Sequence, residues 1–234
     1  MTAPRALFLD FDGLICDTED AARRSWSLLY ASLGLAFPHA LWRRMQGRSD
    51  GEQLALADLG RRLGRAVDPD TRARRLRTKT DLCRAEPLRP GVARLLENAR
   101  LRGIPALVVS SSPRDWVEPH LVRLGVRRCF ADLVTGDLVE RHKPAPDLYL
   151  RALRHVGLPA EEVCAFEDSP TGVRAARAAG VACVAVPSAA GDAAALTEAV
   201  RVLPSLADFS FDRRRLPDPM PDPMPDPMKG SLPR

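Results

Sequence analysis

Two aspartates, spaced two residues apart, follow the first apolar run of the chain. The run from Ala6 to Leu9 is too short for a helix, and Asp10 and Asp12 come directly after it, with Gly13 behind them. This pattern predicts a buried strand whose carboxyl end opens onto a polar site. Carboxylates close together and away from water must be protonated or neutralised, and a divalent cation neutralises them best. Because oxygen donors suit Mg²⁺, the pair suggests a magnesium site; the alternative is a strand ending in a turn, where Asp and Gly are favoured anyway.

Three more polar stretches follow apolar runs or lie in loops between them. Ser110 comes after the run 104–109, Lys143 stands before Pro144 in a polar loop, and Glu167 and Asp168 follow the run 163–166. Each has a structural explanation by itself, such as turn chemistry, a surface lysine or an acidic helix start. In parallel sheets, however, ligands bind beyond the carboxyl ends of strands. We therefore expect these side chains to lie near Asp10.

An alternation of strands and helices must position these groups. Helix patterns cover 91–102, 115–124 and 146–156, and another begins with Ser169 as N-cap and Pro170 as first helical residue and ends before Gly180. Strand patterns cover 104–109, 132–135, 163–166 and 181–186. A final helix is expected at 192–202 and a short edge strand at 206–211. Wholly apolar strands that alternate with helices predict an α/β fold with a doubly wound parallel sheet covered on both faces.

The segment between the first strand and residue 87 has a different pattern. Apolar residues such as Trp26, Leu29, Tyr30 and Leu33 recur at helical spacing, and 41–46, 50–63 and 70–84 are also helix-like. We expect a core domain of residues 1–15 and 87–212 with an inserted helical cap at 16–86. The repeated Pro-Asp-Pro-Met of the segment 213–234 predicts a disordered tail, because proline at every second position fits neither a helix nor a central strand.

The composition fits a cytoplasmic protein of ordinary size. The chain has 234 residues, of which 45% are hydrophobic, so one domain with an insertion can bury a core. No stretch has the length of a membrane span, and no secretion signal opens the chain. The five cysteines are scattered and read as buried apolar residues of a reducing compartment; Cys16, near the site, is expected to pack rather than react. We expect no membrane association and a monomer or weak dimer.

Much of the net charge of +5 comes from one basic run. Its members are Arg61, Arg62, Arg65, Arg72, Arg74, Arg75, Arg77 and Lys79. Aromatic residues that could stack on bases are not interleaved, so we expect no nucleic-acid partner. The run is typical of a solvated helix face, and a weaker alternative is a positive field that steers an anionic small molecule toward the site.

Up to about residue 211, the chain resembles the haloacid dehalogenase superfamily, in particular its β-phosphoglucomutase-like phosphatases with a helical cap. The resemblance is carried by matches in this order: Asp10-Phe11-Asp12-Gly13, Ser110, Lys143-Pro144, Glu167-Asp168-Ser169, Gly172 and Ala179-Gly180. It implies that Asp10 attacks phosphorus and becomes an aspartyl phosphate. Asp12 would protonate the leaving oxygen and then activate water. Ser110 would donate to a phosphoryl oxygen, and Lys143 would stabilise the charge.

The resemblance also implies Mg²⁺ as the cofactor. Its ligands would be the Asp10 carboxylate, the Asp12 backbone carbonyl and Asp168, with Glu167 helping through a water. The cap would close over the site, and Arg48, Ser111, Arg114 and Arg24 are candidates to contact the substrate.

Departures from the family's patterns select among its branches. Dehalogenases of this fold lack a second aspartate like Asp12. The presence of Asp12 in this chain therefore favours phosphate-ester chemistry. β-Phosphoglucomutases have a histidine where this chain has Ala22, and an arginine after Gly-x-Ser where this chain has Asp50. We therefore expect a Mg²⁺-dependent phosphatase of a small phosphorylated metabolite, such as a sugar phosphate. The alternatives are a hexose phosphate mutase and a catalytically quiet binding or regulatory protein of the same fold.

Overall fold

A parallel six-stranded sheet forms the centre of the molecule. The computed structural model describes residues 3–45, 51–188 and 193–211. The strands are β1 (Ala6–Leu9), β2 (Ala106–Val109), β3 (Asp132–Val134), β4 (Val163–Glu167), β5 (Ala182–Ala185) and β6 (Arg201–Val202). Their order across the sheet is β3-β2-β1-β4-β5-β6, and every pair is parallel. This confirms the predicted doubly wound α/β fold, whose order reverses beside β1.

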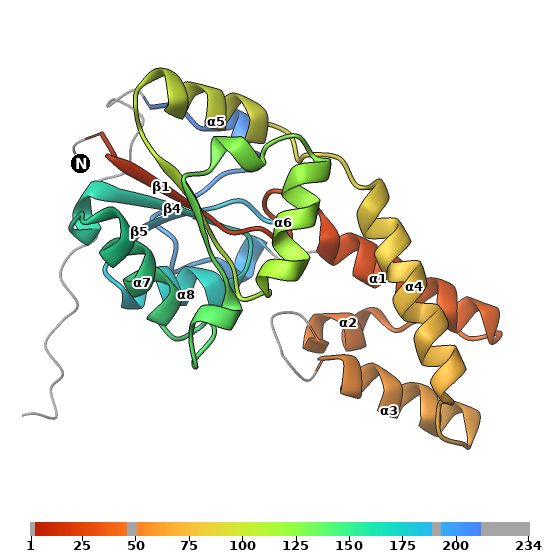
Figure 1. Cartoon of the computed structure of the whole chain (residues 1–234). Helices are drawn as coiled ribbons and strands as arrows, with labels where there is room; N and C mark the ends of the chain where they lie inside the picture. The colour runs from red at the N-terminus through yellow and green to blue at the C-terminus, as the bar shows by residue number, and fades with distance from the viewer. Residues whose placement is uncertain (1–2, 46–50, 189–192, 212–234) are drawn as a thin grey trace, which may run out of the picture.

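Helices cover both faces of the sheet (Figure 1). On one face lie α5 (Val92–Leu101) and α6 (Arg114–Arg123), and on the other α7 (Asp147–Val156) and α8 (Pro170–Ala178). Successive residues of β1 alternate between the two faces, as in any strand. Leu7 and Leu9 pack with α5 and α6, whereas Ala6 and Phe8 pack with α7 and α8. The apolar strand runs are thus explained by burial on both faces.

The register of the central strands brings their polar ends together. Leu9 pairs with Val108 of β2 and with Phe166 of β4. The Asp10 amide continues this ladder and donates to the Phe166 carbonyl at 3.0 Å. The residues that follow the three strands therefore meet at one edge of the sheet.

A unit of four helices, α1–α4, stands beside this edge (Figure 1). The helices are α1 (Thr18–Ser32), α2 (His39–Met45), α3 (Gly51–Leu63) and α4 (Pro69–Ala85). They enclose a separate apolar cluster that includes Trp26, Tyr30, Trp42 and Leu59. The described residues of the segment 18–85 contain no strand, as predicted for the helical insertion. We call α1–α4 the helical unit. None of the helices in the described ranges is both long and apolar enough to cross a bilayer.

One member of the basic run, Arg75, is buried, whereas the sequence suggests that the run is a solvated helix face. Arg75 is 4% exposed: its guanidinium donates to Glu52 at 2.6 Å and lies 4.4 Å from the centre of the Trp26 ring. An arginine can pack its flat guanidinium on an aromatic ring while it pairs with a carboxylate, which compensates for its burial. Arg61 and Arg62 behave as expected, since both pair with Asp58 near the surface.

The end of the described chain also differs from its prediction. In place of a helix at 192–202 and a strand at 206–211, the structure has 3₁₀ turns at Ala193–Ala195 and Leu206–Asp208 around strand β6. The amides of Val200 and Leu203 donate to carbonyls of β5, so pairing at the sheet edge overrides the helical preference of the alanine-rich segment. Phe209 packs edge-on against Phe166 at 4.8 Å instead of entering a strand. The predicted tail, residues 213–234, lies outside the described residues.

Three other 3₁₀ turns occur in the part of the chain that the structure describes. They span Arg127–Cys129, Gly136–Leu138 and Ala160–Glu162.

Candidate active site

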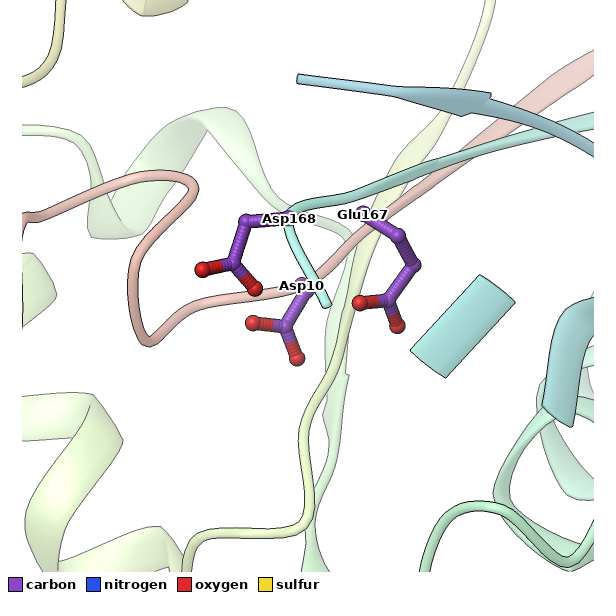
Figure 2. Close-up of side chains that lie close together, drawn as sticks. All are labelled: Asp10, Glu167 and Asp168. Atoms are coloured by element: carbon purple, nitrogen blue, oxygen red, sulfur yellow. The ribbon is translucent and has the colours of Figure 1, made fainter. Parts of the chain in front are cut away.

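Three buried carboxylates converge at the carboxyl edge of the sheet (Figure 2). Asp10 follows β1, Glu167 is the last residue of β4, and Asp168 comes next. One carboxylate oxygen from each residue lies within 4.8 Å of the others. The start of α8 holds this corner in place, because the Ser169 side chain accepts from the Gly172 amide at 3.1 Å, as the sequence predicts.

Lys143 brings a positive charge into this cluster. Its ammonium nitrogen lies 2.5 Å from Asp10 Oδ1, 2.6 Å from Glu167 Oε1 and 2.7 Å from the Val109 carbonyl. The Tyr149 hydroxyl donates to the same Glu167 oxygen at 2.6 Å. The loop before α7 thus reaches the sheet edge, where the sequence places Lys143.

The electrostatics of the cluster favour binding of a further cation. Burial raises the pKa of Asp10 to about 8, although Lys143 opposes the shift. Burial also raises the pKa of Asp168 well above its ordinary value, with Asp10 and Glu167 adding to the effect. Burial opposes the charge of Lys143, but the Asp10 and Glu167 carboxylates raise its pKa above its ordinary value. The Lys143 ammonium thus pairs with two of the three acids, Asp10 and Glu167.

The cluster has the donor set of a divalent cation site. The Glu167 Oε2 atom is buried and has no hydrogen-bond partner among the described residues. Carboxylate oxygens are ligands that Mg²⁺ prefers. The residues present therefore fit the metal that the sequence suggests.

Asp12 lies apart from the three carboxylates and has its own set of donors. Its Oδ1 accepts from the Thr18 hydroxyl at 2.7 Å and from the Trp116 indole nitrogen at 2.9 Å. Its Oδ2 accepts from the Ser112 hydroxyl at 2.5 Å. Since these donors are neutral, Asp12 has a different environment from Asp10, which faces a lysine.

The three serines after β2 line the same place. Ser110 is 1% exposed, and its hydroxyl oxygen accepts from the Ser112 amide at 3.0 Å. The Ser111 hydroxyl accepts from the Lys143 amide at 3.3 Å, which ties the two loops together. Both Ser110 and Ser111 line the cavity that holds Asp10.

Two glycines leave room for the acids. Gly13 has φ +84°, and a Cβ atom there would overlap the Asp168 carboxylate. A Cβ atom on Gly172 would overlap the Glu167 carboxylate. These glycines are required because the backbone passes directly over the acidic groups.

A cavity of about 830 Å³ connects the cluster with the helical unit. This volume is in the usual range for small-molecule sites, roughly 300–1,000 Å³. It is lined at the sheet edge by Asp10, Asp12, Ser110, Lys143 and Asp168, and elsewhere by Glu19, Trp42, Arg43, Lys79, Trp116, His142 and Arg174, among others.

Sequence reasoning missed most of this second group. The sequence places Lys79 within the basic run, whose charge gives no sign of its position at the cavity. Trp116 lies six residues after Ser110, and no pattern in the sequence connects it with Asp12.

The structure does not bring the other arginines suggested as substrate contacts to the cavity in the part of the chain that it describes. Arg48 lies outside the described residues. Arg114 is not among the described residues that line the cavity, because its guanidinium pairs with Glu118 at 3.1 Å and with Asp132 at 3.2 Å. Arg24 is held by Asp20 and Glu86.

Cys16 is buried, as the sequence predicts. The Arg123 guanidinium comes within 3.8 Å of its sulfur, a contact that spacing in the sequence did not indicate. Burial still raises the pKa of the Cys16 thiol to about 12, so the thiol does not become a reactive thiolate.

The doubly wound sheet, with paired acids after its first strand and a buried lysine beside them, defines an α/β protein with an acidic site at its strand ends. Residues 4–180 match the family model described as haloacid dehalogenase-like hydrolase. The chain belongs to this family, as the resemblance in its motifs indicated.

Similar proteins are found in several bacteria. The putative phosphatase YhcW of Bacillus subtilis is 35% identical over 79% of this chain and 84% of its own length. The phosphorylated carbohydrates phosphatase of Thermotoga maritima is 30% identical over 75% of this chain and 82% of its own. The crystal structure of a CbbY mutant from Rhodobacter sphaeroides, in complex with xylulose-(1,5)bisphosphate, superposes with a TM-score of 0.66 at 29% identity, covering 88% and 96% of the two chains.

Proposed function

We propose that this protein is a Mg²⁺-dependent phosphatase that hydrolyses a small phosphorylated metabolite, of the sugar phosphate class, through an aspartyl phosphate on Asp10. The observation that carries the proposal is the contrast between Asp10 and Asp12. Asp10 is buried against Lys143, whereas Asp12 accepts from three neutral donors at the same cavity. Two carboxylates in different environments can take the separate roles of nucleophile and acid/base. The phosphatase names of the relatives support the reaction class.

In the first step, an Asp10 carboxylate oxygen forms a bond to phosphorus, and the bond from phosphorus to the ester oxygen breaks. Asp12 gives its proton to that leaving oxygen, so the product is a neutral alcohol. In the second step, Asp12 takes a proton from a water molecule whose oxygen attacks phosphorus. Inorganic phosphate leaves, Asp10 regains its carboxylate, and Asp12 is protonated for the next turnover.

Ser110 and Lys143 hold the phosphoryl group during these steps. The Ser110 hydroxyl would donate to a phosphoryl oxygen, and the Lys143 ammonium would balance the charge on the nucleophile and the phosphoryl oxygens. Lys143 already uses Asp10 Oδ1 as a partner, which orients that carboxylate.

The metal site belongs to the same cluster. We propose that the Asp10 and Asp168 carboxylates and the Asp12 backbone carbonyl hold Mg²⁺, with Glu167 acting through a water. When bound, the ion supplies positive charge that offsets repulsion between the phosphate and the acids.

The helical unit supplies the remaining walls of the site. We propose that residues 16–86 form a cap over a core of residues 1–15 and 87–212. Glu19, Arg43 and Lys79 line the cavity from the helical unit, so it offers both acidic and basic groups to a bound metabolite. Such a lining suits a metabolite with several hydroxyl groups, as a phosphorylated sugar has.

The experiment is an assay of inorganic phosphate release from a panel of hexose, pentose, polyol and nucleotide phosphates. Wild type is compared with Asp10→Asn, and with Asp115→Asn as a matched control on the exposed side of α6. The proposal is supported if wild type and Asp115→Asn both release phosphate, if EDTA abolishes this release, and if Asp10→Asn releases none. If the folded wild type releases no phosphate from any compound, or interconverts sugar phosphate isomers only with a bisphosphate activator, the proposal is wrong.

A further inference from the structure

The two oxygens of the Asp12 carboxylate are not equivalent. Oδ1 accepts two hydrogen bonds, from the Thr18 hydroxyl and from the Trp116 indole, whereas Oδ2 accepts one from the Ser112 hydroxyl. The donors come from the helical unit, from α6 and from the loop after β2. Three separate parts of the fold therefore fix one carboxylate.

The indole differs from the two hydroxyls in what it can do. A serine or threonine hydroxyl can rotate to donate or to accept, but an indole N–H can only donate, in the plane of its ring. The Trp116 N–H lies 2.9 Å from Asp12 Oδ1 and can use that oxygen only as an acceptor. An oxygen that carries a proton is a poor acceptor, so the oxygen that faces Trp116 is kept free of a proton.

Contacts with two side chains, His120 and Lys79, hold the Trp116 ring in place. The ring meets His120 edge-on, with centres 4.6 Å apart, and His120 in turn lies 5.8 Å from the Phe11 ring. Lys79 of α4 places its ammonium 5.1 Å from the centre of the Trp116 ring. A cation over an indole face is an attractive arrangement, so the helical unit helps to seat this ring.

From this geometry we propose that Trp116 is a positioning residue that reserves Oδ1 of Asp12 as an acceptor, so that Oδ2 is the oxygen that carries the transferred proton. The proposal rests on the phosphatase function given above, in which Asp12 protonates the leaving oxygen. The Ser112 hydroxyl beside Oδ2 can turn to accept when that oxygen is protonated, and it can turn away when the proton leaves. Trp116 acts through Asp12 and need not touch the substrate.

The test variant is Trp116→Phe, which keeps an aromatic ring beside His120 and Lys79 but removes the N–H. With an alkyl phosphomonoester that wild type hydrolyses, kcat/KM is expected to fall roughly tenfold to a hundredfold, because orientation of a general acid contributes on this scale. KM is expected to stay within about twofold, since proton transfer belongs to the transition state. Trp26→Phe is the matched control, because Trp26 packs inside the helical unit and not at Asp12.

The leaving group provides a second readout that general damage to the site would not reproduce. 4-Nitrophenyl phosphate releases a stable anion that does not need a proton from Asp12. Since kcat/KM covers only the steps up to the first irreversible bond cleavage, Trp116→Phe is expected to lose much less of it with this ester than with the alkyl ester. Equal losses with both esters, or no loss with the alkyl ester, would overturn the proposal.

A spectroscopic measurement tests the hydrogen bond without turnover. The Trp116 indole resonance in a ¹H–¹⁵N spectrum is identified by its loss in Trp116→Phe. In Asp12→Ala it is expected to move more than the indole resonances of Trp26 and Trp42, and an unmoved resonance would overturn the proposal. An active wild type with a fully active Trp116→Phe refutes this inference alone, whereas a folded wild type without phosphatase activity refutes the proposed function as well.

Discussion

The ammonium group of Lys143 lies 2.5 Å from Asp10 Oδ1, and the two side chains are only 5% and 9% exposed. A buried ion pair is stable only when its remaining donors and acceptors are also satisfied. Lys143 meets this condition, because an ammonium has three N–H groups and the structure gives it three acceptors: Asp10, Glu167 and the Val109 carbonyl. The lysine therefore has a fixed position beside the nucleophile proposed here.

Replacing Lys143 with methionine is expected to destabilise the fold as well as abolish activity. Asp10 and Glu167 would lose the ammonium that pairs with both of them, and breaking a buried pair costs about 3–5 kcal/mol. Urea unfolding in EDTA measures the loss. Arg177→Met is the matched control, because Arg177 pairs with Glu198 at the surface, where a pair contributes about 0–1 kcal/mol. Equal stability of the two variants would contradict this account.

Tyr149→Phe is expected to weaken Mg²⁺ binding. The Tyr149 hydroxyl donates to Glu167 Oε1 at 2.6 Å, so its removal loosens an acid of the metal cluster. Loss of a partner that orients a metal-site group typically costs about tenfold or more in affinity. The Mg²⁺ concentration for half-maximal activity measures the effect.

Tyr30→Phe is the control for that experiment. The Tyr30 hydroxyl also donates to a carboxylate, Asp58 at 3.0 Å, but within the helical unit. Both variants are expected to lose about 1–3 kcal/mol of stability, as is usual for a hydrogen bond to a charged group. Only Tyr149→Phe is expected to change the Mg²⁺ requirement, and a similar change in both would show that the hydroxyl has no specific role at the metal cluster.

The sequence predicts those features that depend on local patterns. The strand at 6–9 and the aspartates after it lie in one short stretch, and Ser169 and Pro170 mark the start of α8 directly. Parallel strands share one edge, so the position of Asp10 beside Glu167 follows from topology. The helix expected at 192–202 was wrong because partners in β5 are distant in sequence.

Other features of the site depend on contacts that spacing does not reveal. Trp116 donates to an acid 104 residues earlier in the chain, and nothing in its neighbourhood predicts this partner. Arg75 and Lys79 have the same charge as the arginines around them, yet one is buried on Trp26 and the other lies over Trp116. The type of site is therefore predictable, while the partners that adjust it require the folded arrangement.

Gly13→Ala is expected to abolish activity. Its Cβ atom would overlap the Asp168 carboxylate, and Gly13 also has φ +84°. Gly34→Ala separates the two effects, because Gly34 has φ +73° and nothing lies within 4 Å of the added Cβ atom. Both variants are expected to lose about 1–2 kcal/mol through backbone strain, measured by urea unfolding.

The additional effect at Gly13 is displacement of Asp168. Mg²⁺ binding, followed by calorimetry, is therefore expected to be lost in Gly13→Ala and retained in Gly34→Ala. Retention of normal Mg²⁺ affinity in Gly13→Ala would mean that Asp168 does not contribute to the metal site.

His120 is expected to make the stability of the fold depend on pH. The ring is 6% exposed, packs against Phe11 and Trp116, and lies 3.4 Å from Arg123. Burial lowers its pKa below the ordinary 6.5; Arg123, Arg84 and Lys79 act in the same direction, and Asp12 opposes them. The unfolded chain therefore binds a proton at this residue more readily than the folded one. The resulting stability is present above pH 6.5 and is lost as the pH falls below it, toward the lowered pKa.

Urea unfolding of wild type and His120→Gln at pH 7.5, 6.5 and 5.5 measures this contribution. Other groups titrate alike in the two proteins, so the difference between their free energies of unfolding isolates His120. Wild type is expected to lose more stability than His120→Gln between pH 6.5 and 5.5, because only wild type must exclude a proton from the buried ring. Parallel losses would show that the folded protein accepts the proton as easily as the unfolded chain, so that Asp12 balances the burial of the ring and the nearby cations.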